Sequence, residues 1–282
     1  MEDYMKVIIS AESTIDMPKD MCANFGIHVI PYTFTMGDKV YTDGDITNQD
    51  IFDFVAKNKS LPRTTAINRY EYEEYFKSLL KQGDAVVHFC LSSGFSSTCS
   101  NAQAVAEEMK NVYVVDSKNL STGIALLAIK ASNWAKEGLD AKTIYDKANA
   151  LVPKVQASFV LDKLQYLAKG GRCSGMAAFS ASLLSIKPSI IVKDGKMIVG
   201  KKYMGKLDGA IKKYCDDILA SCPNVDLEYA FVTYSSATPE RVEIARKALQ
   251  SKGFKNILET TANATVTSHC GPNTLGILFI KE

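Results

Sequence analysis

The sequence has few of the residues that metal centres and disulfide frameworks need. Its seven cysteines are odd in number and scattered, and no two of them form a C-x-x-C pair. A disulfide framework or a cysteine-rich zinc site is therefore not expected. Only three histidines occur, and their spacing relative to the cysteines fits no closed metal site. We expect reduced thiols, no metal and a cytoplasmic location.

Several function classes lack their motifs or their charge. The chain has no Walker A sequence, no G-x-G-x-x-G that opens a helix and no H-E-x-x-H. The formal net charge is only +2, from 33 basic and 31 acidic residues, so nucleic acid is not an expected partner. No signal peptide is recognisable, and no apolar run approaches the roughly 18 residues of a membrane span. We predict no integral membrane contact and at most a transient contact with a membrane surface.

Strand-like and helix-like segments alternate in the first half of the chain. Short apolar runs begin at residues 7, 85 and 112, and each is followed by a helical pattern. This alternation is typical of an α/β fold with a mostly parallel, doubly wound sheet. In such sheets ligands bind beyond the carboxyl ends of the strands, where Ser13-Thr14, Ser92-Ser93 and Ser117 all lie.

The second half has a different pattern. Asp194-Gly195 between two apolar runs predicts a β-hairpin, and helices alternate with strands on both sides of it. We therefore predict two domains, an N-terminal α/β domain over residues 1–155 and a C-terminal mixed α+β domain over residues 156–282. Further local expectations are a strand over 28–36, a loop over 61–68, an apolar helix over 174–185 and a loop over 268–273.

A serine-rich turn stands out between a predicted strand and a predicted helix. The strand breaks at Ser92-Ser93-Gly94, and the helix is entered through Ser96, Ser97 and Thr98. Free backbone N–H groups, hydroxyls and the helix dipole at one place suit a carboxylate, a phosphate or an oxyanion. An ordinary N-cap is the alternative.

Two other residues are candidates for chemistry. His269 can donate a hydrogen bond to a carboxylate or act as a general base, or it is a surface histidine. Arg172, in a Gly-Gly-Arg turn, can clamp an anion or simply be exposed. A serine acyl hydrolase that uses Ser93 or Ser96 with His269 is one hypothesis, but the segment Gly94-Phe-Ser-Ser-Thr98 departs from the nucleophile elbow G-x-S-x-G.

Seven separated segments share their motifs with one known family. They occur at residues 12–18 (ESTIDMP), 61–65 (LPRTT), 91–98 (LSSGFSST), 116–123 (DSKNLSTG), 161–172 (LDKLQYLAKGGR), 184–188 (LSIKP) and 269–272 (HCGP). In this order they resemble the DegV family of bacterial fatty-acid-binding proteins. The departures from the family pattern are Glu12 for aspartate, Ala66 and Ile67 within the S-Q-P-S segment, and Ser97 for glycine.

The resemblance implies a two-domain α/β protein that holds one long-chain fatty acid between its domains. It further implies a carrier, not an enzyme, with no cofactor, that presents the carboxylate to a separate fatty-acid kinase subunit for phosphorylation. By position in the family motifs, Thr64, Ser93 and His269 are implied as carboxylate ligands and Arg172 as a head-group or partner contact. Ser96, Ser97, Thr98 and Ser117 are implied to lie nearby.

The tail and the head group of a fatty acid contribute differently to binding. At roughly 0.8 kcal/mol per buried methylene, a chain of about sixteen carbons gains on the order of 12 kcal/mol before the costs of association. The head group instead needs hydrogen bonds, because a buried carboxylate is tolerated only when it is paired. Residues 176–184 and 190–192 are our candidates for the tail pocket, with ordinary core packing as the alternative.

Overall fold

A parallel sheet organises the first part of the chain. In the computed structural model, which describes residues 5–174 and 186–282, its strands lie in the order β2-β1-β6-β7, with every neighbouring pair parallel. Every residue of β6 is buried, as expected for a parallel strand that is covered on both faces. The strands are β1 (Val7–Glu12), β2 (Ile27–Ile30), β6 (Ala85–Cys90) and β7 (Val112–Asp116).

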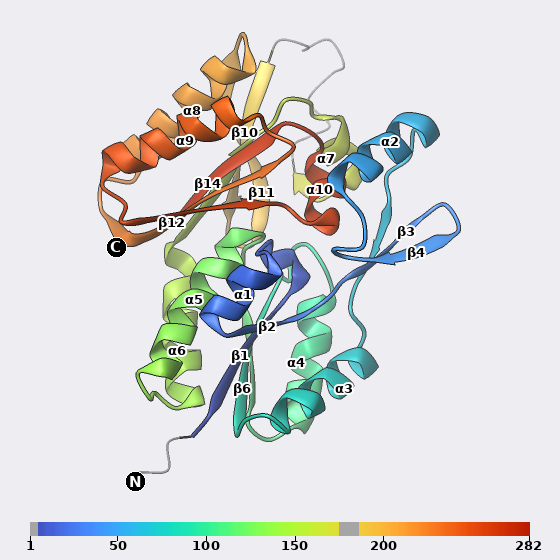
Figure 1. Cartoon of the computed structure of the whole chain (residues 1–282), viewed down its shortest axis with the longest axis vertical. Helices are drawn as coiled ribbons and strands as arrows, with labels where there is room; N and C mark the ends of the chain where they lie inside the picture. The colour runs from blue at the N-terminus through green and yellow to red at the C-terminus, as the bar shows by residue number, and fades with distance from the viewer. Residues whose placement is uncertain (1–4, 175–185) are drawn as a thin grey trace.

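Helices cover this sheet, with α3 and α4 on one side in Figure 1 and α5 and α6 on the other. Helix α5 is apolar over most of its surface because it also contacts strands of the second sheet. The predicted alternation of strand and helix is therefore confirmed in this part of the chain. The elements are η1 (Ser13–Ile15), α1 (Lys19–Phe25), α3 (Arg69–Leu80), α4 (Thr98–Glu108), α5 (Thr122–Lys136), α6 (Ala141–Leu151) and η2 (Val152–Lys154).

A mixed sheet organises the second part, with the order β13-β12-β14-β8-β10-β11-β9. Strands β10 and β11 form the predicted hairpin, and both Asp194 and Gly195 have the positive φ that its two-residue turn requires. The elements are β8 (Val155–Val160), α7 (Gln165–Gly170), β9 (Cys173–Ser174), β10 (Ile186–Lys193), β11 (Lys196–Met204), α8 (Leu207–Ser221), β12 (Val225–Ser235), α9 (Pro239–Lys252), β13 (Asn256–Thr261), α10 (Ala264–Cys270) and β14 (Thr274–Lys281).

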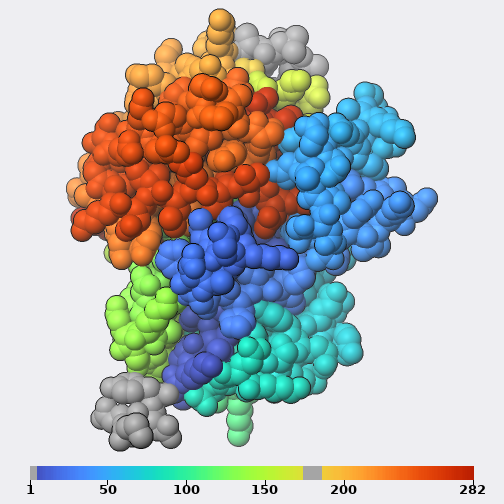
Figure 2. Space-filling view, in the orientation of Figure 1, coloured from blue at the N-terminus to red at the C-terminus, as the bar shows by residue number. Residues whose placement is uncertain are grey.

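A small antiparallel sheet, in the order β4-β3-β5, joins the two parts. Its strands are β3 (Thr33–Met36), β4 (Lys39–Thr42) and β5 (Arg63–Thr65), and α2 (Asn48–Asn58) follows β4. Helix α2 packs against α10, so this segment lies against the carboxyl-terminal part in Figures 1 and 2. The division at residues 155 and 156 stays a prediction.

Three local expectations need correction, and a fourth falls outside the described residues. The strand predicted over 28–36 is broken at Pro31-Tyr32 into β2 and β3, which belong to different sheets. The loop predicted over 61–68 contains β5, and the loop predicted over 268–273 begins with the last turn of α10. Both errors arise from tertiary contacts, because β5 pairs with β3 and α10 packs on α7. The helix predicted over 174–185 lies outside the described residues, apart from Ser174 in β9.

Over the described ranges, none of the helices combines the length and the apolar character needed to cross a membrane.

Candidate functional site

A cavity of about 370 Å³ lies where the three sheets meet. Its walls come from the carboxyl ends of β1 and β6, from β5 and from α10, with one residue of the β10–β11 hairpin. Most of the lining surface is apolar, and the polar groups that reach it come from segments far apart in the sequence. The lining residues are Thr14, Tyr32, Thr64, Ala66, Leu91, Phe95, Ser96, Ser97, Leu120, Arg172, Met197, Thr265, Val266, His269 and Cys270.

Thr64 and His269 face each other on the cavity wall. Pairing of Thr64 with Phe34 across β5 and β3 fixes the threonine, and α10 carries the histidine. The Thr64 Oγ1 and His269 Nε2 atoms are 3.4 Å apart, a long hydrogen bond. Burial, together with the nearby positive charge of Arg172, lowers the pKa of His269 to about 4. The imidazole is therefore neutral at physiological pH and can donate one N–H.

Arg172 brings a positive charge to the same cavity. It follows Gly171, whose φ of +67° ends helix α7, and its Nη1 donates to the carbonyl oxygen of Gly170 at 2.7 Å. A guanidinium has further N–H donors in its planar fork, so this bond leaves others for an anion. The structure thus brings together Thr64, Arg172 and His269, although Thr64 and His269 lie 205 positions apart in the sequence.

The serine-rich turn divides between two environments. Ser96 and Ser97 line the cavity, whereas Thr98 lies buried beneath it as the first residue of α4. The Thr98 backbone N–H donates to Ser96 Oγ at 3.2 Å, which leaves the Ser96 hydroxyl proton available. The predicted anion site at the start of α4 therefore faces the cavity through Ser96.

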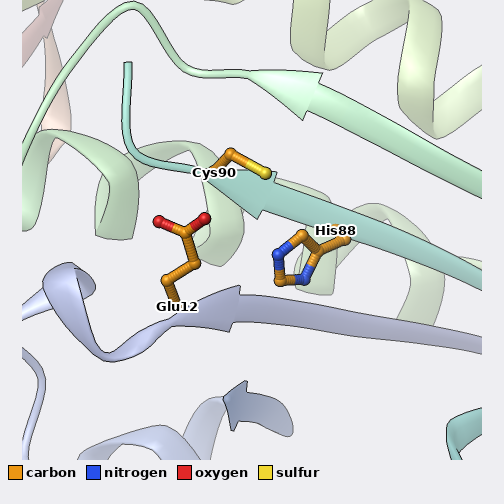
Figure 3. A group of neighbouring side chains, drawn as sticks. All are labelled: Glu12, His88 and Cys90. Carbon is orange, nitrogen blue, oxygen red and sulfur yellow. The ribbon is translucent and has the colours of Figure 1, made fainter. Parts of the chain in front are cut away.

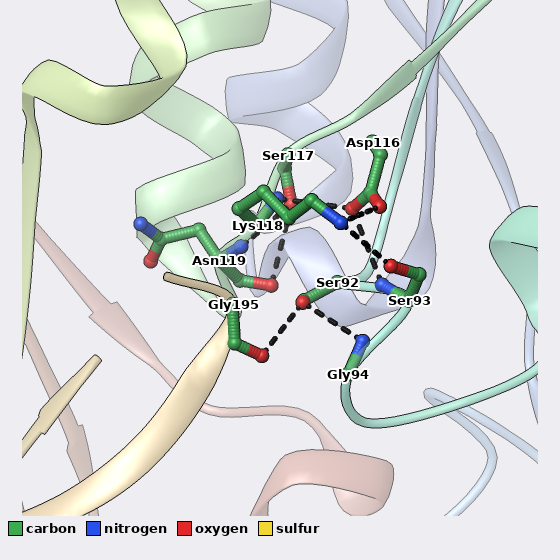
Figure 4. Close-up of polar contacts among 8 residues, drawn as sticks. All are labelled: Ser92, Ser93, Gly94, Asp116, Ser117, Lys118, Asn119 and Gly195. Atoms are coloured by element: carbon green, nitrogen blue, oxygen red, sulfur yellow. Dashed lines mark hydrogen bonds and ion pairs between the residues drawn. The ribbon is translucent and has the colours of Figure 1, made fainter. Parts of the chain in front are cut away.

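Ser93 is not among the residues that line the cavity, and its side chain lies beside Asp116 and Lys118 (Figure 4). Its backbone N–H donates to Asp116 Oδ1 at 3.2 Å, and its hydroxyl accepts from Lys118 Nζ at 2.8 Å. Ser117 is also absent from the cavity wall, and its hydroxyl donates to the carbonyl oxygen of Asn119 and accepts from the Asn119 N–H. Ser93 and Ser117 thus organise the loops after β6 and β7, and the structure does not bring them to Thr64 and His269.

The same turn contacts the tip of the β10–β11 hairpin. Ser92 Oγ donates to the carbonyl oxygen of Gly195 at 2.8 Å and accepts from the Gly94 N–H at 3.1 Å (Figure 4). A Cβ atom added to Gly94 would lie 2.2 Å from the Gly195 oxygen. The absence of a side chain at Gly94 is therefore what lets the hairpin, which carries Met197 into the cavity wall, approach so closely.

A buried carboxyl group supports the cavity from below. Glu12 accepts hydrogen bonds from Tyr72 Oη at 2.5 Å, Thr98 Oγ1 at 2.9 Å and the Leu91 N–H at 2.8 Å, and from Thr14 Oγ1 at 3.3 Å. Burial raises the pKa of Glu12 above its ordinary value, although these donors oppose the shift. The network joins the ends of β1 and β6 to the start of α4, and so fixes the loops that carry Ser96 and Thr14.

One group of potential metal ligands occurs among the described residues. Ligand atoms of Glu12, His88 and Cys90 lie within 4.8 Å of one another in the interior of the parallel sheet (Figure 3). His88 Nδ1 is bonded to Ser10 Oγ at 2.8 Å, and both Glu12 oxygens already accept hydrogen bonds. A metal ion would have to displace these donors, so the group is better described as a hydrogen-bonded core.

Some cavity residues were not predicted. Tyr32 follows the strand break at Pro31, and Met197 lies on the predicted hairpin. Ile190 and Val192, within the predicted tail pocket, are buried and are not among the lining residues of this cavity, so their contact with an acyl tail stays a prediction. Residues 176–184 lie outside the described ranges. Tyr32 had no local signal, because its place depends on how β3 crosses to a different sheet.

These features define a class: α/β proteins in which a parallel and a mixed sheet enclose a largely apolar, ligand-sized cavity with polar groups gathered on its wall. The particular family follows from comparison of the whole chain. A model of the DegV family matches residues 6–282, and the chain belongs to that family.

Relatives match over nearly their full length. A DegV domain-containing protein of Caldanaerobacter subterraneus subsp. tengcongensis is 29% identical over 285 residues, which cover 98% of this chain and 99% of the relative. A DegV family protein from Thermus thermophilus, whose structure is described as showing fatty acid binding, superposes with a TM-score of 0.88 at 24% identity and covers 99% of this chain and 100% of its own.

Two further solved structures have the same fold. DegV of Bacillus subtilis, described as a fatty acid binding protein, has a TM-score of 0.84 at 25% identity and covers 99% of this chain and 100% of its own. A DegV family protein from Eubacterium eligens, loaded with heptadecanoic acid, also has a TM-score of 0.84, at 18% identity, with 98% of this chain and 100% of that chain covered. The predicted α/β fold and family are confirmed.

Proposed function

We propose that this protein binds one long-chain fatty acid, with the carboxylate held by Thr64, Ser96, Arg172 and His269. One observation carries the proposal. The hydroxyl of Thr64, the neutral imidazole of His269 and the guanidinium of Arg172 lie together on the wall of one largely apolar cavity. A carboxylate only accepts hydrogen bonds, and each of these side chains is a donor. The fatty acids bound by DegV relatives support the choice of ligand.

Ser96 replaces Ser93 in this proposal as the serine ligand. Both serines belong to one turn, but only Ser96 lines the cavity, and the Ser93 hydroxyl accepts from Lys118 Nζ. Lys118 is also paired with Asp116 at 2.7 Å, so the Ser93 hydroxyl belongs to an ion-paired cluster outside the cavity lining. Ser93 therefore serves as a matched control for Ser96.

The acyl tail needs an apolar path away from the head group. A second, small cavity of about 30 Å³ shares Leu120, Val266 and Cys270 with the first and continues towards the mixed sheet. Its lining is mainly apolar, including Phe159 and Leu278. We place the tail along these shared walls, between the parts 1–155 and 156–282 of the chain.

We further propose that the protein is a carrier and that a separate kinase subunit phosphorylates the bound carboxylate. Arg172 is an exposed residue that also lines the cavity, which places its charge where an approaching partner can reach it.

The hydrolase alternative lacks support, because in the described part of the chain His269 Nε2 pairs with Thr64 and no hydrogen bond joins His269 to Ser93 or Ser96.

Extraction of the purified protein with organic solvent, followed by mass spectrometry, tests the proposal. We expect about one fatty acid per chain, and we expect Thr64→Val and Ser96→Ala each to lower retention while Ser93→Ala retains it. Addition of a fatty-acid kinase subunit, ATP and Mg²⁺ should then yield acyl phosphate. Protein that neither carries nor takes up fatty acid would refute the carrier, and ester hydrolysis abolished by Ser96→Ala would establish the hydrolase instead.

A further inference from the structure

Two glycines bring helices α7 and α10 unusually close together. A Cβ atom added to Gly170, the last residue of α7, would lie 2.6 Å from His269 Nδ1 on α10. A Cβ atom added to Gly271, just after α10, would lie 2.5 Å from the ring of Tyr166 on α7. The His269 ring therefore packs directly against the backbone of Gly170, and the Tyr166 ring packs directly against the backbone of Gly271.

We propose that Gly170 is a positioning residue for the head-group site, because its missing side chain seats the His269 imidazole opposite Thr64. This inference rests on the proposed function. The carbonyl oxygen of Gly170 also accepts the hydrogen bond from Arg172 Nη1 at 2.7 Å. One residue that touches no ligand therefore contacts two of the side chains that would hold the carboxylate.

The imidazole has little freedom to adapt if Gly170 gains a side chain. Its Nδ1 atom is buried, and no group in the described residues forms a hydrogen bond with it. On the opposite edge, Nε2 is already 3.4 Å from Thr64 Oγ1. The distance between a methyl carbon at residue 170 and His269 Nδ1 would have to increase by about 0.8 Å, from 2.6 Å to an ordinary contact of 3.4 Å. The ring would have to move towards Thr64 or rotate away from the cavity.

The backbone itself does not require glycine at this position. Gly170 lies within α7 and lacks the positive φ of Gly171, so alanine fits its conformation. Alanine also has the higher helix propensity. A glycine here is therefore explained by what lies against its Cα, the His269 ring, and not by local chain geometry.

The test compares Gly170→Ala with Gly209→Ala, a helical glycine of α8 whose added Cβ would meet nothing within 4 Å. Fatty-acid affinity is measured with a fluorescent long-chain fatty acid, and the His269 ring is followed by ¹H–¹⁵N correlation of the imidazole nitrogens over a pH titration. We expect Gly170→Ala to change the His269 shifts and pKa and to weaken binding about tenfold, the size of one hydrogen bond to a charged group. Gly209→Ala should change neither.

The His269→Ala background separates the two proposals. If Gly170 acts through the imidazole, Gly170→Ala should cause no further loss of affinity once His269 is alanine, and a Gly170→Ala protein that fails to fold should be rescued by His269→Ala. Unchanged affinity in His269→Ala would overturn the head-group site itself. Reduced affinity in His269→Ala, combined with wild-type affinity and wild-type imidazole shifts in Gly170→Ala, would overturn the role of Gly170 alone.

Discussion

Substitution of Gly94 by alanine tests the contact between the serine-rich turn and the β10–β11 hairpin. The added methyl carbon would lie 2.2 Å from the carbonyl oxygen of Gly195, a backbone atom that cannot rotate aside. Gly94 does not have a positive φ, so the change adds no backbone strain of its own. The hairpin tip must therefore withdraw by about 1.2 Å to restore an ordinary 3.4 Å contact.

That withdrawal breaks the hydrogen bond from Ser92 Oγ to Gly195, which is now 2.8 Å long. A lost hydrogen bond costs about 1 kcal/mol, and strain from overpacking adds about 1–3 kcal/mol. We expect Gly94→Ala to lower the free energy of unfolding by roughly 2–4 kcal/mol. Because Met197 on the hairpin lines the cavity, fatty-acid dissociation should also become faster.

Urea denaturation measures the change in stability, since a lower midpoint at an unchanged slope reports stability alone. Gly209→Ala is the control, because it adds the same methyl group where nothing lies within 4 Å. If Gly94→Ala unfolded at the same urea concentration as the wild type, the close contact between the turn and the hairpin would be refuted.

Two further predictions concern the buried groups beneath the cavity. Tyr72→Phe removes a hydrogen-bond donor from the buried carboxyl group of Glu12 and should lower the free energy of unfolding, measured by urea denaturation, by about 1.5–3 kcal/mol. Tyr70→Phe is the control, because Tyr70 is 71% exposed and its substitution should leave the free energy of unfolding unchanged. Equal effects of the two substitutions would contradict the Glu12 network. Burial lowers the pKa of His88 to about 3. Below pH 6.5 the unfolded chain binds a proton that folded His88 excludes, so this residue destabilises the fold by up to about 5 kcal/mol as the pH falls to 3. An NMR titration that showed His88 protonating near pH 6.5 would be inconsistent with this burial.

Local patterns predicted the elements whose structure is decided locally. The apolar run of β6 and the Asp194-Gly195 turn are both found as expected, because strand burial and two-residue turns leave direct sequence signals. Thr64 and His269 lie on elements that were expected to be loops. Their strand and helix depend on pairing with β3 and packing on α7, which no short window of sequence contains.

Which of Ser93 and Ser96 lines the cavity also depends on contacts that are distant in the sequence. Both serines belong to one turn and have the same chemistry, and the family resemblance favoured Ser93. The rotation of the turn is set by contacts from elsewhere, with Ser92 bonded to Gly195 and Ser93 to Asp116 and Lys118. These contacts leave Ser96 on the cavity wall.

The central claim is that a fatty-acid carboxylate lies among Thr64, Ser96, Arg172 and His269. A long-chain fatty acid labelled with ¹³C at its carboxyl carbon tests this most directly, because its NMR signal reports the surroundings of the head group. We predict one bound resonance at a one-to-one ratio, shifted in His269→Ala and Ser96→Ala and unchanged in Ser93→Ala. A bound resonance that moved in Ser93→Ala but in neither of the other variants, or no bound resonance at all, would contradict the account.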